Sequence, residues 1–148
     1  MKDLGTPLLI NQPSYFMLNR WVEGGLLNVA EEEGIGTIAY MPLQQGILTG
    51  KYLKDIPEDS RANGHSIYFS KNDITAKTLA KVAKLNQIAQ ERNQSLAQMS
   101  LAWVLRHKNV ASALIGASRP EQIVENVKAI SNLKFSEEEL AQINNILN

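Results

Sequence analysis

Three segments of the sequence hold residue types that could bind a small molecule, and each directly follows a short apolar run. In the first segment, residues 10–15, the Asn11 and Gln12 amides could hydrogen-bond a carboxamide or carbonyl group of a ligand. Loops that follow parallel strands point toward ligands in barrels and open sheets alike. The Gln-Pro-Ser sequence is also ordinary turn chemistry at a strand end, so both interpretations stay open.

The second segment, residues 40–52, combines an aromatic ring with glycines and a cation. Tyr40 offers a flat face to an aromatic ligand, and the backbone amides after it could hold a phosphate together with Lys51. Gly46 and Gly50 would let the chain approach such a ligand closely. The glycine spacing is not that of a Walker loop. The alternative is a buried strand that ends in an ordinary loop.

The third segment, residues 115–126, passes from a predicted strand through Gly116 into a helix N-terminus. Unpaired amides and the positive end of the helix dipole favour an anion there. Ser118 would stand at the cap, and the planar guanidinium of Arg119 suits phosphate. Capping alone explains Ser118 but not Gly116 and Arg119 together, so phosphate binding and simple capping are both retained.

Other candidate residues indicate no further chemistry. His65 and His107 stand alone without a partner in any recognisable triad spacing, and we expect each at the surface or at a helix end. The absence of cysteine excludes a disulfide framework, a thiolate nucleophile and a thiolate metal site. No pattern in the sequence resembles a metal site.

Short apolar runs predict the strands that position these segments, at residues 8–10, 37–40 and 113–115. None alternates polar with apolar residues, which favours strands covered on both faces of a parallel sheet. Apolar residues spaced three and four apart predict helices over residues 26–33 and 74–92.

Three capping boxes, in which a serine hydroxyl accepts from the amide three residues on, mark three further helix starts. They open helices predicted over residues 96–107, 120–130 and 137–147, and they pair Ser95 with Gln98, Ser118 with Glu121, and Ser136 with Glu139. The repeated order of strand then helix predicts a parallel sheet with right-handed crossovers. Residues 41–73 form a connection too long for an ordinary loop, which is typical of a functional segment.

The composition excludes several classes of protein. The 148 residues are 44% apolar and 20% charged, which suits one globular domain rather than a disordered tail. Fifteen basic and fifteen acidic side chains balance, so neither nucleic acid nor an anionic membrane is an expected partner. No apolar run approaches the roughly 20 residues of a membrane span, and no export signal is recognisable. We therefore expect a cytoplasmic protein.

At these three segments the sequence resembles the C-terminal part of an aldo/keto reductase, closest to the branch of potassium-channel β subunits and bacterial glyceraldehyde-3-phosphate reductases. The resemblance covers essentially all 148 residues. The motifs that carry it are Asn11-Gln12-Pro13-Ser14-Tyr15, then Pro42-Leu43-x-x-Gly46-x-Leu48-Thr49-Gly50-Lys51-Tyr52, then Gly116-Ala117-Ser118-Arg119-x-x-Gln122-x-x-Glu125-Asn126.

The resemblance implies an α/β fold, the C-terminal portion of a (β/α)8 TIM barrel with about strands 6–8 and their helices. Residues 1–148 would form a single partial domain that lacks the N-terminal half of the barrel. The family binds NADP(H) along the C-terminal mouth of the barrel. This agrees with the independent rule that barrel phosphate sites are built after the last two strands.

The resemblance also implies a role for each matching position. Gln12 would bond the nicotinamide carboxamide and Tyr40 would stack on the nicotinamide ring, where the branch often carries tryptophan. Arg61 matches an arginine near the adenosine 2′-phosphate. The pyrophosphate would be lined by Lys51 and the backbone at Met41, Leu43, Gln44 and Gln45, and the adenosine end by Gly116, Ala117, Ser118, Gln122, Glu125 and Asn126. Met41 stands where serine is common, and Arg119 where the branch varies.

No catalytic residue is implied for this chain. The family reaction needs a tyrosine acid, assisted by a lysine, an aspartate and a histidine, to protonate the carbonyl oxygen. All four lie on earlier strands of the family pattern, so we expect a truncated product that is inactive alone. Three strands cannot close a barrel, and their open apolar edges predict self-association. The alternative function is a non-enzymatic module that forms oligomers or binds a partner.

Overall fold

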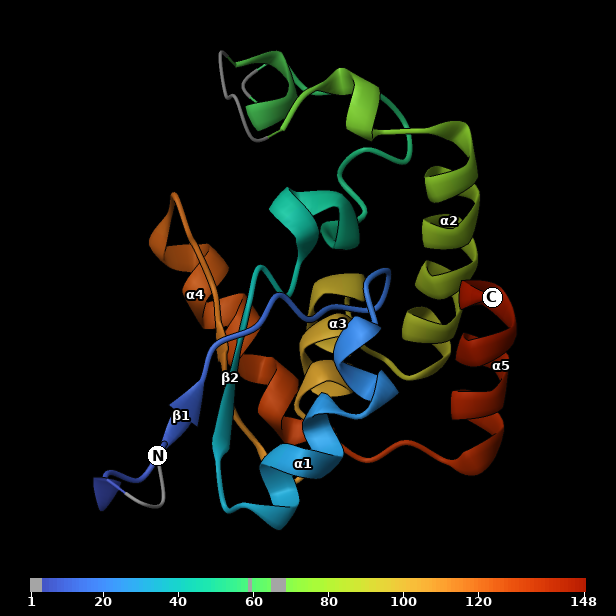
Figure 1. The fold of residues 1–148 in the computed structure, drawn as a ribbon. Helices are drawn as coiled ribbons and strands as arrows, with labels where there is room; N and C mark the ends of the chain where they lie inside the picture. Colours follow the sequence, from blue (N-terminus) through green and yellow to red (C-terminus); the bar gives the residue numbers. More distant parts are fainter. Residues whose placement is uncertain (1–3, 59, 65–68) are drawn as a thin grey trace.

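A parallel sheet of three strands organises the structure, with the strands in the order in which they occur along the chain (Figure 1). The computed structural model describes residues 4–58, 60–64 and 69–148. Both strand pairs are parallel, as the sequence predicts. The strands span Ile10–Asn11 (β1), Gly36–Tyr40 (β2) and Val110–Leu114 (β3). Their bounds differ from the apolar runs because a run is a pattern of residue types, whereas backbone hydrogen bonds define a strand.

The five helices predicted from local signals are all present. Four of them are shorter than predicted: α1 by one residue at its end, α2 at both ends, and α3 and α4 at their ends, where α3 stops at Val104 and α4 stops at Val127 before a 3₁₀ turn. The helices span Leu26–Glu32 (α1), Ala76–Glu91 (α2), Leu96–Val104 (α3), Pro120–Val127 (α4) and Glu137–Leu147 (α5). The described parts of the long connection hold the short 3₁₀ turns Gln44–Thr49, Arg61–Asn63 and Lys71–Asp73.

Two of the three predicted capping boxes are confirmed, those that begin at Ser95 and Ser136. The box that pairs Ser118 with Glu121 is wrong. Pro120 occupies the first helical position of α4, so the cap falls on Arg119 and the side chain that reaches back is that of Gln122. A proline at this position is favoured because its ring fixes a helical φ and its missing N–H is not needed there.

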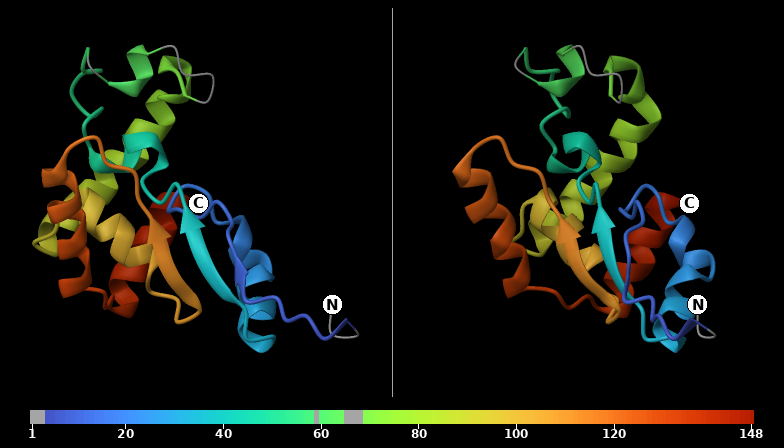
Figure 2. Two further views of the ribbon diagram at one scale, coloured as in Figure 1. Left: turned by 90° about the vertical axis from the view of Figure 1, so that its left-hand side faces the viewer. Right: turned by 60° about the vertical axis from the view of Figure 1, so that its left-hand side comes forward.

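One face of the sheet is packed and the other is open. The prediction that the strands are covered on both faces is wrong for the described residues, since Ile10 on β1 is 54% exposed and Leu114 on β3 is 53% exposed. In Figure 2 the strands face the viewer while helices lie behind and beside them. Continuous apolar runs are typical of strands that have helices on both faces of the sheet. In the described part of the chain, helices cover only one face.

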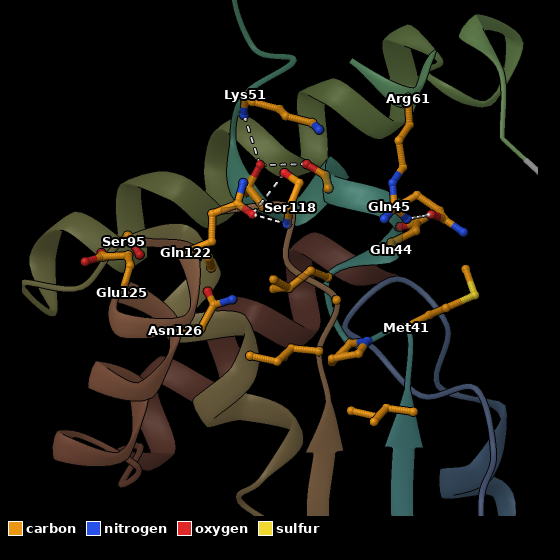
Figure 3. Close-up of a pocket in the computed structure, with 18 of the residues that line it drawn as sticks. Met41, Gln44, Gln45, Lys51, Arg61, Ser95, Ser118, Gln122, Glu125 and Asn126 are labelled. Atoms are coloured by element: carbon orange, nitrogen blue, oxygen red, sulfur yellow. Dashed lines mark hydrogen bonds between the residues drawn. The ribbon is translucent and has the colours of Figure 1, made fainter. Parts of the chain in front are cut away.

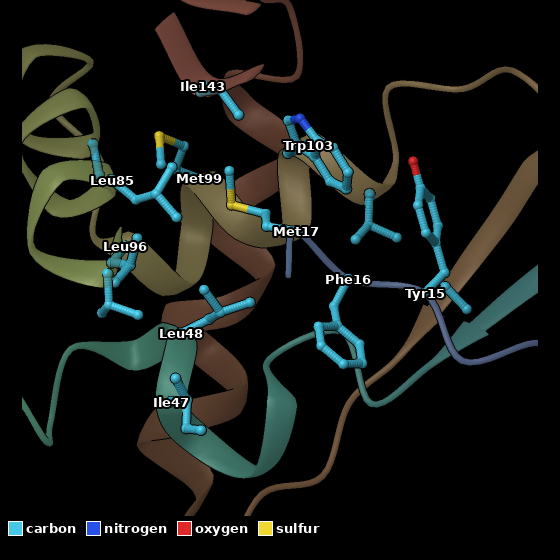
Figure 4. Close-up of a cluster of buried hydrophobic side chains, with 14 of the residues drawn as sticks. Tyr15, Phe16, Met17, Ile47, Leu48, Leu85, Leu96, Met99, Trp103 and Ile143 are labelled. Carbon is cyan, nitrogen blue, oxygen red and sulfur yellow. The ribbon is translucent and has the colours of Figure 1, made fainter. Parts of the chain in front are cut away.

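The hydrophobic core fills the space between the sheet and the helices, and α3 runs through its middle (Figure 4). All nine residues of α3 are buried, including Met99 and Trp103. Side chains from distant parts of the chain pack against it, among them Met17 from the segment after β1, Leu85 from α2 and Ile143 from α5. A helix that is apolar on all sides is stable only inside a fold, so α3 has to be enclosed.

A polar cluster around Glu23 fastens the segment after β1 to the end of α3. The Tyr15 hydroxyl donates to Glu23 Oε1 at 2.6 Å, and Arg106 Nη2 donates to the same oxygen at 2.6 Å. Burial alone would raise the pKa of the Glu23 carboxyl, but the surrounding donors outweigh it and hold this pKa well below its ordinary 4.5. Tyr15, Arg20 and Arg106 donate hydrogen bonds to the carboxylate, and His107 Nε2 lies 3.7 Å from it.

Replacing Glu23 with glutamine should therefore change how stability depends on pH. A carboxylate whose pKa is depressed by folding stabilises the protein above about pH 4.5, and this contribution is lost as the pH falls below that value. We expect Glu23→Gln to cost about 2 kcal/mol at pH 7 and to flatten the decline of the melting temperature below pH 4.5. Thermal unfolding between pH 3 and pH 7, followed by circular dichroism, measures both effects.

The matched control is Glu32→Gln, an exposed carboxylate on α1 whose replacement should leave the pH profile unchanged. Parallel profiles for wild type and Glu23→Gln would contradict the role given to the cluster.

Candidate functional site

A cavity of about 780 Å³ opens at the carboxyl ends of β2 and β3 (Figure 3). Three parts of the chain that lie far apart in sequence line it: residues 40–51 after β2, Arg61 in the long connection, and residues 114–126 after β3. The start of α3 completes the wall. Every cofactor-binding residue predicted from the sequence lines this cavity except Gln12 and Ala117, which are exposed outside it.

Gln12 nevertheless lies at the same end of the sheet as the cavity. It directly follows β1, and Ser14, two residues further on, forms a parallel bridge with Tyr40. Tyr40 ends β2 with its side chain 38% exposed, so one part of its surface is available to a ligand. The first and second predicted segments thus meet at one edge of the sheet.

The backbone after β2 adopts a conformation that side chains rarely allow. Met41, Gln44 and Gln45 all have positive φ angles of 45° to 57°, and Gly46 follows with a φ of 93°. Leu43, just before this run, is right-handed with φ −104° and ψ 9°. A right-handed residue followed by a left-handed one turns neighbouring N–H groups toward a common point, which can bind an anion. Two amides of this turn are already satisfied within it, since Gln44 N donates to Met41 O at 2.8 Å and Gly46 N donates to Leu43 O at 3.0 Å. Strain of this kind is concentrated at functional sites.

Gly46 makes room for a cation at this turn. A Cβ atom on Gly46 would lie 2.7 Å from Lys51 Cε and 2.9 Å from Lys51 Nζ, closer than atoms can approach. The ammonium group of Lys51 therefore lies across the glycine, and it also stands 4.8 Å from the centre of the Tyr52 ring. This turn thus combines backbone amides with a positive charge.

Arg61 brings a second cation to the cavity. Its Nη1 donates to Gln45 Oε1 at 2.8 Å, and its Nη2 lies 4.0 Å from the position of a Cβ on Gly116. The guanidinium group therefore stands between the loop after β2 and the loop after β3. Arginine in such a place suits a phosphate because its donors match the spacing of phosphate oxygens.

The loop after β3 differs from the sequence-based prediction. Unpaired amides were expected at the start of α4, but Gln122 Oε1 accepts from Ser118 N at 2.8 Å and from Arg119 N at 3.3 Å. These amides are satisfied within the chain, because the third helical residue reaches back to the cap. The Ser118 hydroxyl donates to the same oxygen at 3.3 Å, so Arg61 is the donor that an anion at this end would meet.

Beyond this turn, α4 contributes a carboxylate and an amide to the cavity. Glu125 accepts from Gln98 Nε2 at 2.6 Å and from Lys128 Nζ at 3.1 Å, and Asn126 is buried. Four lining residues lie within the predicted segments without having been given a role, namely Pro42, Thr49, Ile115 and Glu121, and three lie outside those segments, namely Ser95, Ala97 and Leu114. Only the capping box at Ser95 gave a signal that a helix begins here.

Other candidate residues lie away from the cavity. His107 follows α3 with Nε2 3.7 Å from Glu23 Oε1, which agrees with a position at a helix end, whereas His65 lies outside the described residues. The rings of Tyr15 and Tyr52 are buried in the core, and burial raises the pKa of the Tyr15 hydroxyl. Within residues 4–58, 60–64 and 69–148, no group of three acidic, histidine or cysteine side chains could hold a metal ion. No described helix is long and apolar enough to cross a bilayer.

The donor set of the cavity suits a long anionic ligand with flat apolar parts. Two exposed cations, Lys51 and Arg61, and the turn after β2 line it, and Leu114 and Ile115 give it an apolar wall. Gln44 also lines the cavity, but its side-chain oxygen Oε1 is enclosed and has no hydrogen-bond partner among the described residues.

Comparison with known proteins gives consistent matches over the full length of the chain. The model of the aldo/keto reductase family matches residues 1–148. The chain is 53% identical over 141 residues to an L-glyceraldehyde 3-phosphate reductase of Escherichia coli, covering 93% of this chain and 41% of that protein. It is 40% identical over 143 residues to a putative voltage-gated potassium channel subunit beta of Schizosaccharomyces pombe, covering 93% and 42%.

A solved glycerol dehydrogenase from Gluconobacter oxydans is similar in structure, with a TM-score of 0.77 and 30% identity. The match covers 96% of this chain and 43% of that one. The chain thus spans about two fifths of the length of the relatives it matches. Its three parallel strands with their helices are consistent with part of a (β/α)8 barrel.

Gly46→Ala should disturb the turn that carries Lys51. The new methyl group would collide with the lysine side chain, and an alanine at φ 93° is strained, so we expect a loss of about 1–2 kcal/mol in the free energy of unfolding. Urea denaturation followed by tryptophan fluorescence gives this value.

Gly64→Ala serves as the matched control, because Gly64 has an ordinary φ of −81° and a Cβ there would meet only Arg61 O at 3.5 Å. Its stability should stay within about 0.5 kcal/mol of wild type. Equal midpoints for the two variants would show that the turn tolerates a side chain at Gly46.

Proposed function

The chain belongs to the aldo/keto reductase family, and from that premise we propose that it binds NADP(H) in the cavity at the ends of β2 and β3. We further propose that its residues form about strands 6–8 of the family barrel. The observation that carries the proposal is the convergence of three distant segments on one cavity that offers two cations, a turn of backbone amides and an apolar wall. Family members generally bind a nicotinamide dinucleotide, and a dinucleotide has the matching charges and flat rings.

Each part of the cofactor has a counterpart along the cavity. The ring of Tyr40 would take the nicotinamide, with Gln12 at the same edge of the sheet to bond its carboxamide. The strained turn after β2 and Lys51 would hold the pyrophosphate. Arg61 would meet the 2′-phosphate, which favours NADP(H) over NAD(H). The adenosine would rest against residues 116–126.

The bound cofactor would supply a hydride for carbonyl reduction, whereas these residues bind and orient it. Reduction also needs an acid that protonates the carbonyl oxygen. Tyr15 and Tyr52 are enclosed in the core and cannot meet a substrate in the cavity. We therefore propose that the 148 residues alone bind the cofactor without reducing aldehydes. The relatives named as L-glyceraldehyde 3-phosphate reductases support carbonyl reduction as the reaction for which these residues bind the cofactor. A cytoplasmic location remains a prediction.

Arg61→Ala should weaken NADPH binding while leaving NADH binding unchanged. Loss of a charge-assisted contact to phosphate costs about 1.5 kcal/mol, which corresponds to roughly a tenfold rise in the dissociation constant. Isothermal titration of both nucleotides into both proteins measures the effect. Lys108→Ala is the control, since Lys108 is exposed and pairs with Glu31 away from the cavity.

Absence of saturable NADPH binding by the wild-type chain would overturn the proposal. If Arg61→Ala weakened the affinity for NADPH and NADH equally, Arg61 would not contact the 2′-phosphate. Oxidation of NADPH in the presence of an aldehyde by the purified 148 residues would contradict the predicted inactivity.

We also propose that the open faces of the sheet and of α4 bind a second copy of the chain. The chain exposes 9214 Å², whereas a folded monomer of 16.4 kDa exposes about 7500 Å². The excess is more than the roughly 800 Å² that each partner contributes to a standard interface. Apolar side chains gather at two places: Leu8, Leu9 and Ile10 along β1, and Ile123, Val124, Val127 and Ile130 along α4 and the turn after it.

A double substitution Ile123→Glu with Val127→Glu should reduce this self-association, because both side chains are at least half exposed and lie one turn apart on α4. Sedimentation velocity over a range of concentrations should show a wild-type species heavier than one chain and a lighter double variant. Gln142→Glu, an exposed position on α5, should behave as wild type. A wild-type protein that sediments as a single chain at all concentrations would refute the proposal.

A further inference from the structure

A second, smaller cavity lies beside β3, on the side away from β2. In Figure 2 α4 lies on this side of β3, so the cavity runs between the strand and that helix. Its volume is about 230 Å³. Apolar side chains from the end of α3, from β3, and from α4 with the turn after it line this side groove, among them Leu101, Leu105, Ala111, Ala113, Val127 and Ile130.

The strand that borders the side groove has an unpaired edge with small side chains. β3 is the last strand of the described sheet, so one of its edges has no neighbouring strand there. Ala111 and Ser112 on this strand are exposed, and Ala113 is half-buried. An extended segment can add to such an edge through main-chain hydrogen bonds while its alternate side chains enter pockets. The side groove suits a strand that carries an apolar side chain.

The opposite edge of the sheet offers a strand of that kind. Leu8, Leu9 and Ile10 are 49%, 69% and 54% exposed. Leu9 O accepts from Gly36 N at 2.8 Å, so the start of β2 already holds this segment in place. β1 is the first strand of the sheet, and its outer edge has no neighbouring strand among the described residues. The chain therefore carries an apolar strand at one edge of its sheet and a groove that suits one at the other.

The two edges match in the face of the sheet that they present. Side chains alternate between the faces of a strand, so Leu9 shares the face of Asn11, which pairs with the buried Thr37. Ala113, which lines the side groove, pairs with the buried Ala39. Leu9 and the side groove therefore lie on the same, packed face. When the helices of two copies lie on one face, β1 of the second copy has to run parallel to β3, because the antiparallel orientation reverses the faces.

A two-fold pairing of β3 with β3 of a second copy accounts for less. Toward the side groove β3 presents Ala111, Ser112 and Ala113, which are too small to fill the groove of the other copy. The exposed area exceeds that of a folded monomer by about 1700 Å². Since each partner in a standard interface contributes roughly 800 Å², this excess corresponds to two interfaces for each chain. A contact between β1 and β3 uses both edges, whereas the two-fold pairing uses β3 alone.

We propose that β3 pairs in parallel with β1 of a second copy, and that Leu9 of the second copy enters the side groove. This inference rests on the proposed self-association and specifies the surfaces that meet. Copies join head to tail, since the β1 edge of one chain meets the β3 edge of the next. The contact buries Leu9 against Leu105 and Val127 and adds main-chain hydrogen bonds along both open edges.

The test blocks a different edge in each of two variants. Leu9→Lys sets a charge at the β1 edge, and Ala111→Lys sets one in the side groove, because a lysine on an edge strand opposes pairing. Both positions are exposed in the single chain, so neither change disturbs its core. Under sedimentation velocity each variant alone should run as a single chain, and far-ultraviolet circular dichroism checks that each is folded.

An equal mixture of the two variants distinguishes head-to-tail pairing from other contacts. The free β1 edge of the Ala111→Lys variant matches the free β3 edge of the Leu9→Lys variant, so one contact re-forms. The mixture should therefore give a species of twice the mass of one chain and none larger. Both substitutions add positive charge, so attraction between them cannot produce this species. Gln142→Lys adds the same charge at an exposed position of α5 and should associate as wild type.

The outcomes are distinguishable. Recovery of the two-chain species only in the mixture supports the inference. If wild type associates but the mixture stays monomeric, or if either variant alone still associates, the pairing is wrong although the self-association stands. If wild type sediments as a single chain, no second copy covers the side groove, and the self-association and this inference are both wrong. None of these outcomes depends on NADPH binding.

Discussion

The requirement that α3 be enclosed on every side determines how the remaining elements are arranged. Nine consecutive buried residues cannot lie at a surface, so β3, α2, α4, the 3₁₀ turn after α4 and the loop after β2 all pack around this one helix. The first turn of the same helix forms part of the cavity wall through Ser95 and Ala97. The cavity thus rests on the most completely packed element of the structure, which gives its polar groups a rigid support.

The loop after β2 has the opposite character, since it is held in a conformation that its own residues disfavour. Met41, Gln44 and Gln45 occupy the left-handed region, which costs of the order of 1 kcal/mol or more for each residue. The conformation persists because the neighbouring Ile47 and Leu48 are fully buried in the core. The burial of Ile47 and Leu48 therefore maintains the unfavourable backbone conformation of the preceding residues, which line the cavity.

Local signals in the sequence predicted more than signals that depend on distant partners. All five helices follow from apolar spacing and capping residues, and the parallel sheet follows from their alternation with strands. The capping box at Ser118 failed because Pro120 is the first residue of α4, which places the cap on Arg119. Neither the left-handed turn at Gln44 nor the contact of Gln98 with Glu125, 27 residues away, has a local pattern that would predict it. Most residues named from the motif resemblance line the cavity, Gln12 and Ala117 excepted, but the resemblance could not show that Gln122 satisfies the amides of the turn before it.

The polar cluster around Glu23 has a consequence for the order of folding. Arg106 contacts Glu23 and Tyr15 across 83 and 91 residues of sequence, whereas α2 and α3 are joined by a short turn. Contacts that close long loops form late, because the entropy of the loop is lost before the contact stabilises anything. The paired helices should thus condense first and the segment from β1 to Gly24 should dock last. In native-state hydrogen exchange, the amides of this docking segment should form the first cooperative unit to open.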